Sequence, residues 1–219
     1  MITDVFSIDE KAVAHLREQW NDLSTQYNAD EGLKAKSFGM LRAHYSREGR
    51  FYHNLSHIKA LLHLFESVKH LIEDTNAIRF GIWFHDVIYD TKRTDNEEAS
   101  ADVAADLLSE LSVDTKTIDF VRQLILATKS HRDKALTEDA KMFLDIDLSI
   151  LGASSEIYEE YSKAIRKEYS WVPGFMYRSA RKKILKGFMK REAIFATAEM
   201  NKRFEAQARL NVADELRAL

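Results

Sequence analysis

The sequence predicts an all-α protein that forms one irregular helical bundle. The chain has only one proline and seven glycines in 219 residues, which leaves few of the signals that punctuate strands and turns. Apolar residues recur at spacings of three and four almost throughout, the period of an amphipathic helix. There is no internal repeat and no low-complexity stretch to mark a boundary, so we expect residues 1–219 to form a single domain.

The helices can be placed approximately in order along the chain. Residues 7–10 and 94–97 both have the capping-box pattern, in which a hydroxyl and an acid satisfy free amides at a helix start. They predict helices that begin near Ile8 and Asp95. Further helices are expected at 33–48, 54–72, 75–89, 114–130, 138–151, 155–170, 174–189 and 192–216, with Pro173 and Gly174 interrupting the pattern after Trp171.

Composition excludes several classes of function. The formal net charge of −3 provides no general attraction to nucleic acid or to an acidic membrane, and no segment approaches the roughly 18 apolar residues of a membrane span. The chain has no cysteine, which excludes disulfides and thiolate ligands and fits a reducing compartment. We therefore expect a cytoplasmic protein with no membrane partner and no nucleic-acid partner, and the oligomeric state stays open.

Two segments place imidazoles within apolar helical patterns. His57 is in line with Leu61 and Phe65, at spacings that share one helical face, so it is expected to point into the core. On the next expected helix His85 lies on an apolar face, with Asp86 about 100° further round. A buried carboxylate needs compensation, which a metal ion beside an imidazole would supply.

A third segment contains two acids that compete as a further ligand. Asp147 has the more apolar neighbours at three and four residues, which favours it over Asp145 as the inward-facing group. Two histidines and two acids suit one divalent ion such as Mn, Co, Ni, Fe, Mg or Zn, and they leave coordination positions for water and substrate. The predicted metal ligands are His57, His85, Asp86 and Asp147, with Asp145 as the alternative.

This ordered set resembles the HD superfamily of predicted metal-dependent phosphohydrolases, which is named for its adjacent His-Asp pair. The resemblance to a bacterial group of these proteins covers most of the chain. It is carried by RFYHNLSHI (50–58), FHDVIYD (84–90), DNE (95–97), DIDL (145–148), ILG (150–152), IRKEY (165–169) and EAQARLN (205–211). The third segment departs from the superfamily's usual Asp-x-Leu form, because Leu148 follows Asp147 directly, and this keeps Asp145 as a candidate.

The resemblance implies an HD-like helical fold and hydrolysis of a phosphate ester by metal-activated water. The expected substrate is a small phosphomonoester or a nucleotide. A phosphate would need cations beyond the ion, and Arg181 and Arg191 share an apolar helical face, although core salt bridges are an equal alternative for them. The neighbouring lysines at 182, 183, 186 and 190 are interpreted as a solvated face.

Three further residues are candidates for contact with the substrate. His53 precedes His57 by one turn and is a candidate fifth ligand, substrate contact or loop anchor, with the last two favoured together. His131 is expected at a helix end, as a phosphate contact or as a ligand of a second metal. Glu97 is expected to cap a helix and could also accept a proton.

Two other functions compete with hydrolysis. A helical di-iron oxygenase would need more ligands, which His53 or His131 would supply. Alternatively, the ion stabilises the bundle without catalysis and the surface binds a partner.

Overall fold

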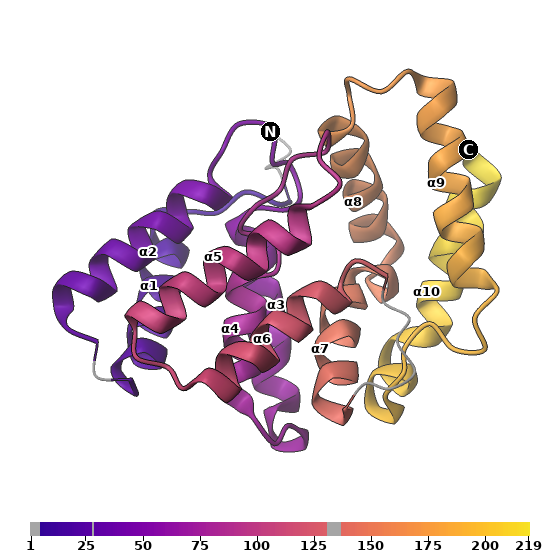
Figure 1. Cartoon of the computed structure of the whole chain (residues 1–219). Coiled ribbons are helices and arrows are strands. Elements are labelled where there is room, and N and C mark those ends of the chain that lie inside the picture. The colour runs from indigo at the N-terminus through magenta and orange to yellow at the C-terminus, as the bar shows by residue number, and fades with distance from the viewer. Residues whose placement is uncertain (1–4, 28, 131–136) are drawn as a thin grey trace. The chain divides into compact units, whose positions relative to one another are not determined.

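The computed structural model describes residues 5–27, 29–130 and 137–219, and in these ranges the protein is entirely helical. They contain ten α-helices, two short 3-10 helices and no strand (Figure 1), which confirms the predicted all-α class. The α-helices are α1 (Glu10–Thr25), α2 (Glu31–Tyr45), α3 (Leu55–Val68), α4 (Thr75–Phe84), α5 (Asn96–Glu110), α6 (Thr115–Ala127), α7 (Glu138–Leu148), α8 (Ser155–Glu168), α9 (Gly174–Met189) and α10 (Ala198–Ala218). The 3-10 helices are η1 (Lys69–Leu71) and η2 (Ser149–Gly152).

The two predicted capping boxes are wrong, although helices begin close to both. Asp9 caps α1, and its carboxylate accepts a hydrogen bond from the amide of Ala12 at 2.8 Å. Asp95 occupies the N-cap position of α5 without a side-chain hydrogen bond to that helix. Its carboxylate forms an ion pair with Arg93 at 2.9 Å, and the N-cap position falls on Asp95 and not on Thr94, whose hydroxyl is the predicted cap.

The prediction that one helix runs from 75 to 89 is wrong at its end, because α4 stops at Phe84. Side chains from other segments form hydrogen bonds with backbone amides and carbonyls that a longer helix would pair internally. Arg50 donates to the carbonyls of Asp86 and Val87 at 2.7 and 3.0 Å, and Ser100 binds both the amide and the carbonyl of Ile88. His85 and Asp86 therefore lie where the chain leaves α4, and not within a helix.

The expected helix at 192–216 begins later, at Ala198, for a similar reason. The carboxylate of Glu205 accepts hydrogen bonds from the amides of Ile194 and Phe195. The carboxylate of Asp145 accepts from the amides of Ala196 and Thr197. These amides are thus satisfied outside a helix, and the segment before α10 folds as a loop.

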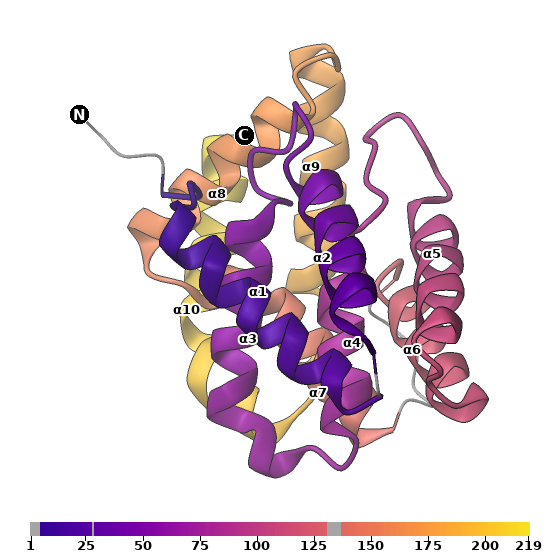
Figure 2. The same ribbon diagram turned by 90° about the vertical axis from the view of Figure 1, so that its left-hand side faces the viewer.

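The chain divides into two compact units, residues 1–144 and 145–219, and the division falls inside α7. The expectation of a single domain stays a prediction. In the first unit α5 pairs with α6, and α4 packs against α3, α5 and α6 (Figures 1 and 2). Its core includes Trp20, whose ring meets the rings of Trp83 and Phe84 edge-on at centroid distances of 5.6 and 5.9 Å.

The second unit packs η2 and α9 against α10. Asn211 of α10 donates to the carbonyls of Leu151 and Ala153 at 2.9 and 2.8 Å, which holds η2 on that helix. Gly152 permits the close approach, because a Cβ atom there would lie 2.6 Å from the Cβ of Phe204. No helix in the described ranges combines the length and the apolar character that crossing a membrane requires.

Candidate metal centre

The first predicted ligand, His57, is placed by the start of α3. Asn54 caps this helix: its side-chain oxygen accepts from the amide of Ser56 at 2.8 Å, and its amide group donates to the carbonyl of Phe6. His57 follows in the first turn and is only 3% exposed, with the ring of Tyr52 at 4.8 Å. The predicted inward orientation of His57 is confirmed.

His85 is equally buried, at 2% exposed, where the chain leaves α4. Its Nδ1 lies 3.0 Å from the carbonyl oxygen of Ile82. A carbonyl oxygen can only accept a hydrogen bond, so this contact assigns the proton to Nδ1. The neutral ring of His85 then presents the lone pair of Nε2, which is the form that binds a metal ion.

The donor atoms of His57, His85 and Asp86 converge. The two Nε2 atoms lie 3.2 Å apart, and Oδ2 of Asp86 lies 3.1 Å from Nε2 of His85 and 4.0 Å from Nε2 of His57. Two nitrogens that are each about 2.1 Å from one ion are about 3.0 Å apart at a right angle and about 3.4 Å apart in a tetrahedron. The spacing of the imidazoles therefore fits two ligands of the same ion.

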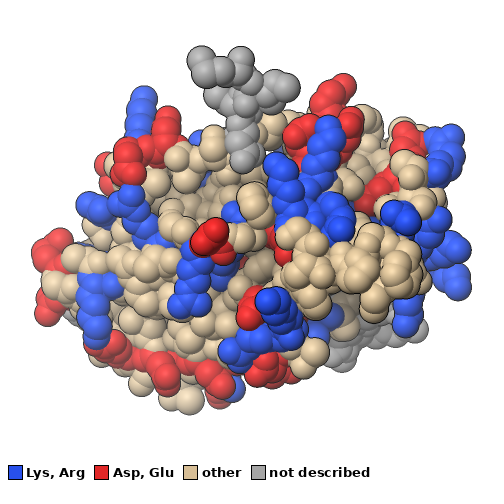
Figure 3. All heavy atoms as spheres, turned by 90° about the horizontal axis from the view of Figure 1, so that it is seen from above, with Lys and Arg blue, Asp and Glu red and all other residues tan. Residues whose placement is uncertain are grey.

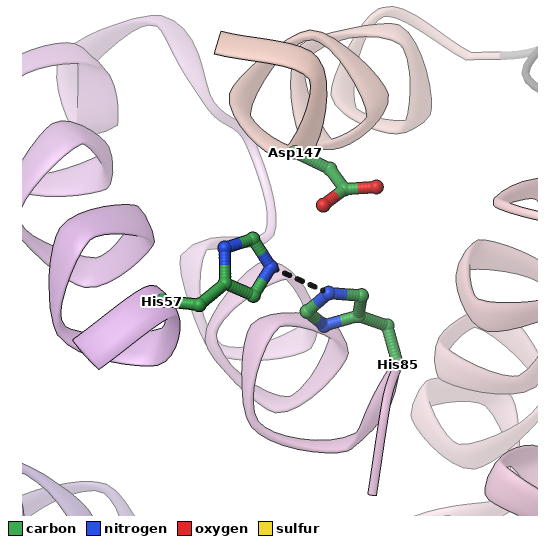
Figure 4. Close-up of side chains that lie close together, drawn as sticks. All are labelled: His57, His85 and Asp147. Atoms are coloured by element: carbon green, nitrogen blue, oxygen red, sulfur yellow. Dashed lines mark hydrogen bonds between the residues drawn. The ribbon is translucent and has the colours of Figure 1, made fainter. Parts of the chain in front are cut away.

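Asp147 joins this group through α7, which is continuous across the division between the units. Phe143 of α7 lies edge-on to the ring of His85, with centroids 6.2 Å apart. Asp147 is four residues further on and therefore shares the helical face of Phe143. His57, His85 and Asp147 each offer a ligand atom, and these atoms all lie within 4.8 Å of one another, so the group could hold a metal ion (Figure 4).

Asp145 has a different structural role from Asp147. It is 2% exposed, and its carboxylate accepts three hydrogen bonds, from the amides of Ala196 and Thr197 and from the hydroxyl of Thr197, at 2.7–2.8 Å. Burial nevertheless raises the pKa of Asp145 above its ordinary value. The sequence favours Asp147 for its more apolar neighbours. Asp145 is in fact the more buried of the two acids, but its carboxylate is engaged with a loop, whereas the half-buried Asp147 is the acid that groups with His57 and His85.

Arg50 links the two histidine segments, a role that the sequence did not suggest. Its guanidinium donates to the carbonyls of His53 and Asp86 at 2.9 and 2.7 Å, and also to that of Val87. It is 8% exposed and lies over the ring of Tyr45 at 5.0 Å. One side chain thus connects the entry to α3 with the exit from α4, the two places that carry three of the four predicted ligands.

His53 lies at the edge of this cluster. Its Nε2 is 3.9 Å from Oδ2 of Asp86, and its ring stacks on Tyr89 at a centroid distance of 4.2 Å. The side chains of His53 and Asp86 are 19% and 20% exposed, whereas those of His57 and His85 are almost fully buried. Of the four, His53 and Asp86 are therefore the side chains that solvent reaches.

The other candidates of the sequence analysis lie in varied surroundings. Glu97, in the first turn of α5, has a carboxylate oxygen 3.9 Å from Nζ of Lys129. Arg181 is buried and binds the carboxylate of Glu215 through two nitrogens, at 2.8 and 2.9 Å, which is the core salt bridge of the alternative interpretation. Arg191 lies over the ring of Phe188 at 4.6 Å. His131 lies outside the described residues, and the functional roles of all four stay predictions.

The electrostatics of the cluster favour a bound cation. The Nε2 atoms of two imidazoles face each other at 3.2 Å, where they can share one proton, and Asp86 brings a carboxylate oxygen to 3.1 Å from Nε2 of His85. Nitrogen and carboxylate oxygen donors of this kind suit divalent ions of the first transition row and zinc.

Comparisons with models of protein families, with curated proteins and with solved structures find no match for this chain.

Proposed function

We propose that the protein is a metal-dependent phosphohydrolase of the HD superfamily that acts on a small phosphomonoester or a nucleotide. The observation that carries the proposal is the buried pair of Nε2 atoms of His57 and His85, 3.2 Å apart, with an oxygen of Asp86 beside them. The order of these residues along the chain supports the family assignment. Absence of cysteine supports a reducing, cytoplasmic setting.

The chemistry needs little from the protein beyond the ion and its positioning. A divalent ion, once bound, lowers the pKa of water and polarises a phosphoryl oxygen, so that no protein nucleophile is required. His57 and His85 would hold the ion from the buried side through Nε2. The hydrogen bond from Nδ1 of His85 to Ile82 would fix the orientation of that ring.

His53 is the side chain best placed to contact the substrate. It lies beside Asp86 at the solvent-accessible edge of the cluster, and its stacking on Tyr89 holds the ring in place. A protonated His53 would donate a hydrogen bond to a phosphoryl oxygen or to the leaving group. Arg181 or Arg191 would supply a second cation for the phosphate only by giving up its present contact. These contacts are the ion pair of Arg181 with Glu215 and the position of Arg191 over the ring of Phe188.

The test is a screen of phosphorylated metabolites, nucleotides included, against protein loaded separately with Mn, Co, Ni, Fe, Mg and Zn. We expect phosphate release from at least one compound, and its loss in His85→Ala but not in His63→Ala, since His63 is an exposed histidine of α3. Failure of every metal with every compound would contradict the proposal. Two irons per chain with oxygen consumption would favour an oxygenase, and a tightly held ion without any turnover would favour a structural role.

A further inference from the structure

Helix α9 presents an unbalanced row of positive charges to solvent. Residues 174–190 contain six basic residues and no acidic one. Arg181 is used internally, in its ion pair with Glu215. The other five make no ion pair with any carboxylate in the described part of the chain; they are Arg178, Lys182, Lys183, Lys186 and Lys190. In contrast, Lys163 of neighbouring α8 lies 2.8 Å from Glu159 and 2.9 Å from Glu160.

Large apolar side chains are exposed on the same hairpin, formed by α8, its connection to α9, and α9. Among the described residues nine large hydrophobic side chains are exposed, and four of them fall between positions 171 and 184. These are Trp171 (52% exposed), Phe175 (70%), Met176 (51%) and Ile184 (54%). Figure 3 views the side on which α8 passes into α9, and Lys and Arg side chains border an area without charged side chains there.

The tip of this hairpin is held in a defined conformation. Arg166 donates to the carbonyls of Tyr169 and Val172, and its guanidinium lies over the ring of Tyr177 at 4.8 Å. The opposite face of α9, with Tyr177 and Leu185, is buried. The exposed apolar and basic side chains are therefore presented on an ordered helix, so little conformational entropy would be lost when they bind a surface.

We propose that the α8–α9 hairpin docks the protein on the surface of an anionic phospholipid bilayer. Trp171, Phe175 and Met176 would enter the headgroup region of the bilayer. The lysines of α9 would contact the phosphates and carboxylates of the lipid headgroups around them. A basic face beside aromatic and aliphatic side chains is the usual composition of helices that lie in a membrane interface. Clusters of four to eight cations bind anionic lipids in the same way.

This proposal departs from the expectation that the protein has no membrane partner. That expectation used the net charge of −3, which averages over the whole chain and conceals the excess of cations on α9. Nucleic acid would also attract the cations. A nucleic-acid partner accounts for the exposed apolar side chains less well than a bilayer does. Met176 and Ile184 are aliphatic and cannot stack on bases as aromatic rings do.

Vesicle co-sedimentation tests the proposal with the whole protein. We expect binding to phosphatidylcholine vesicles that contain roughly a third phosphatidylserine, weak binding to pure phosphatidylcholine, and release at high salt. Lys183→Gln and Lys186→Gln should each weaken binding about fivefold. The pair Trp171→Ser and Phe175→Ser should weaken it by roughly tenfold or more, because exposed apolar side chains no longer enter the interface.

Matched control variants distinguish vesicle binding through the α8–α9 hairpin from nonspecific binding of exposed apolar or basic side chains. Leu210→Ser removes an equally exposed apolar side chain from α10, and Lys202→Gln removes an exposed cation there. Both should bind as the unchanged protein does. The proposal is overturned if anionic vesicles are not bound, if the controls lose as much binding as the hairpin variants, or if a DNA duplex binds more tightly than vesicles and depends on the lysines alone.

Discussion

The Nε2 atoms of His57 and His85 lie 3.2 Å apart, although 28 positions separate the two residues in the chain. Neither ring is exposed to water to any extent, and the second nitrogen of His85 already donates to Ile82. Asp86 brings a carboxylate oxygen to the same point. An ion shared by these groups would satisfy both lone pairs and neutralise the carboxylate at once.

Replacing either histidine should abolish tight metal binding. In His57→Ala or His85→Ala, one of two buried nitrogen ligands is lost, and we expect affinity for Zn or Co to fall by roughly 100-fold or more. The measurement is a competition titration against a chromogenic chelator. His63→Ala changes an exposed histidine of the same helix and should leave the affinity unchanged; equal affinity in all three variants would remove the ion from this cluster.

Arg50 should act on metal affinity through the backbone. Lysine cannot reach three carbonyls with one planar group, so Arg50→Lys should lower the free energy of unfolding by about 1–3 kcal/mol. It should also weaken metal binding about tenfold, because the segments that carry His57 and Asp86 lose their common anchor. Arg47→Lys, at an exposed position nearby, is the control. Unchanged metal affinity in a destabilised Arg50→Lys protein would show that Arg50 stabilises the fold but does not position the metal ligands.

The two acids of α7 should separate metal binding from folding. Asp147→Asn should weaken metal binding and leave stability nearly unchanged. Asp145→Asn turns a donor amide towards the amide of Thr197, and should cost about 1–3 kcal/mol of unfolding free energy. Chemical denaturation and metal titration of both proteins give the comparison. The opposite pattern, with metal lost in Asp145→Asn alone, would exchange the two roles.

The sequence predicted the helices well because their spacing is a local signal, and it failed where distant side chains intervene. The sequence near Ile88 does not show that its amide will donate to the hydroxyl of Ser100. Likewise, the sequence near Ala196 does not show that its amide will donate to the carboxylate of Asp145. The same limit applies to the candidate site. The pattern around His57 predicted its burial, whereas the role of Arg50 depends on a carbonyl 36 residues away.

Gly152 should tolerate no side chain. In Gly152→Ala the new Cβ would meet the backbone oxygen of Phe204 at 2.7 Å, and backbone cannot move aside as a flexible side chain can. We expect a loss of about 1–3 kcal/mol in the free energy of unfolding. Gly39→Ala, in α2, meets no atom within 4 Å and should gain about 0.5–1 kcal/mol from helix propensity. A stable Gly152→Ala protein would mean that η2 and α10 are less closely packed than described.

The ion pair of Glu215 with Arg181 should make stability fall in acid. Burial alone would raise the pKa of Glu215, but hydrogen bonds and the charge of Arg181 outweigh it and lower the pKa below its ordinary value of 4.5. The stabilisation is therefore complete above pH 4.5 and is lost as pH falls through the lower, folded-state pKa.

Urea denaturation at several pH values checks this dependence. Glu215→Gln should be about 3 kcal/mol less stable at pH 7 and should lose less stability on acidification than the unchanged protein. Glu199→Gln, a partly exposed position on the same helix, is the control and should follow the unchanged protein. Parallel stability curves for the unchanged protein and Glu215→Gln would assign the acid sensitivity to other groups.

X-ray absorption at the metal edge of the zinc- or cobalt-loaded protein tests whether His57 and His85 bind the same ion. We expect nitrogen and oxygen ligands at about 2.0–2.2 Å from the metal, with the multiple-scattering features of two imidazoles. One imidazole should disappear in His57→Ala and one in His85→Ala. A shell of oxygen atoms alone, or one that is identical in all three proteins, would contradict this expectation.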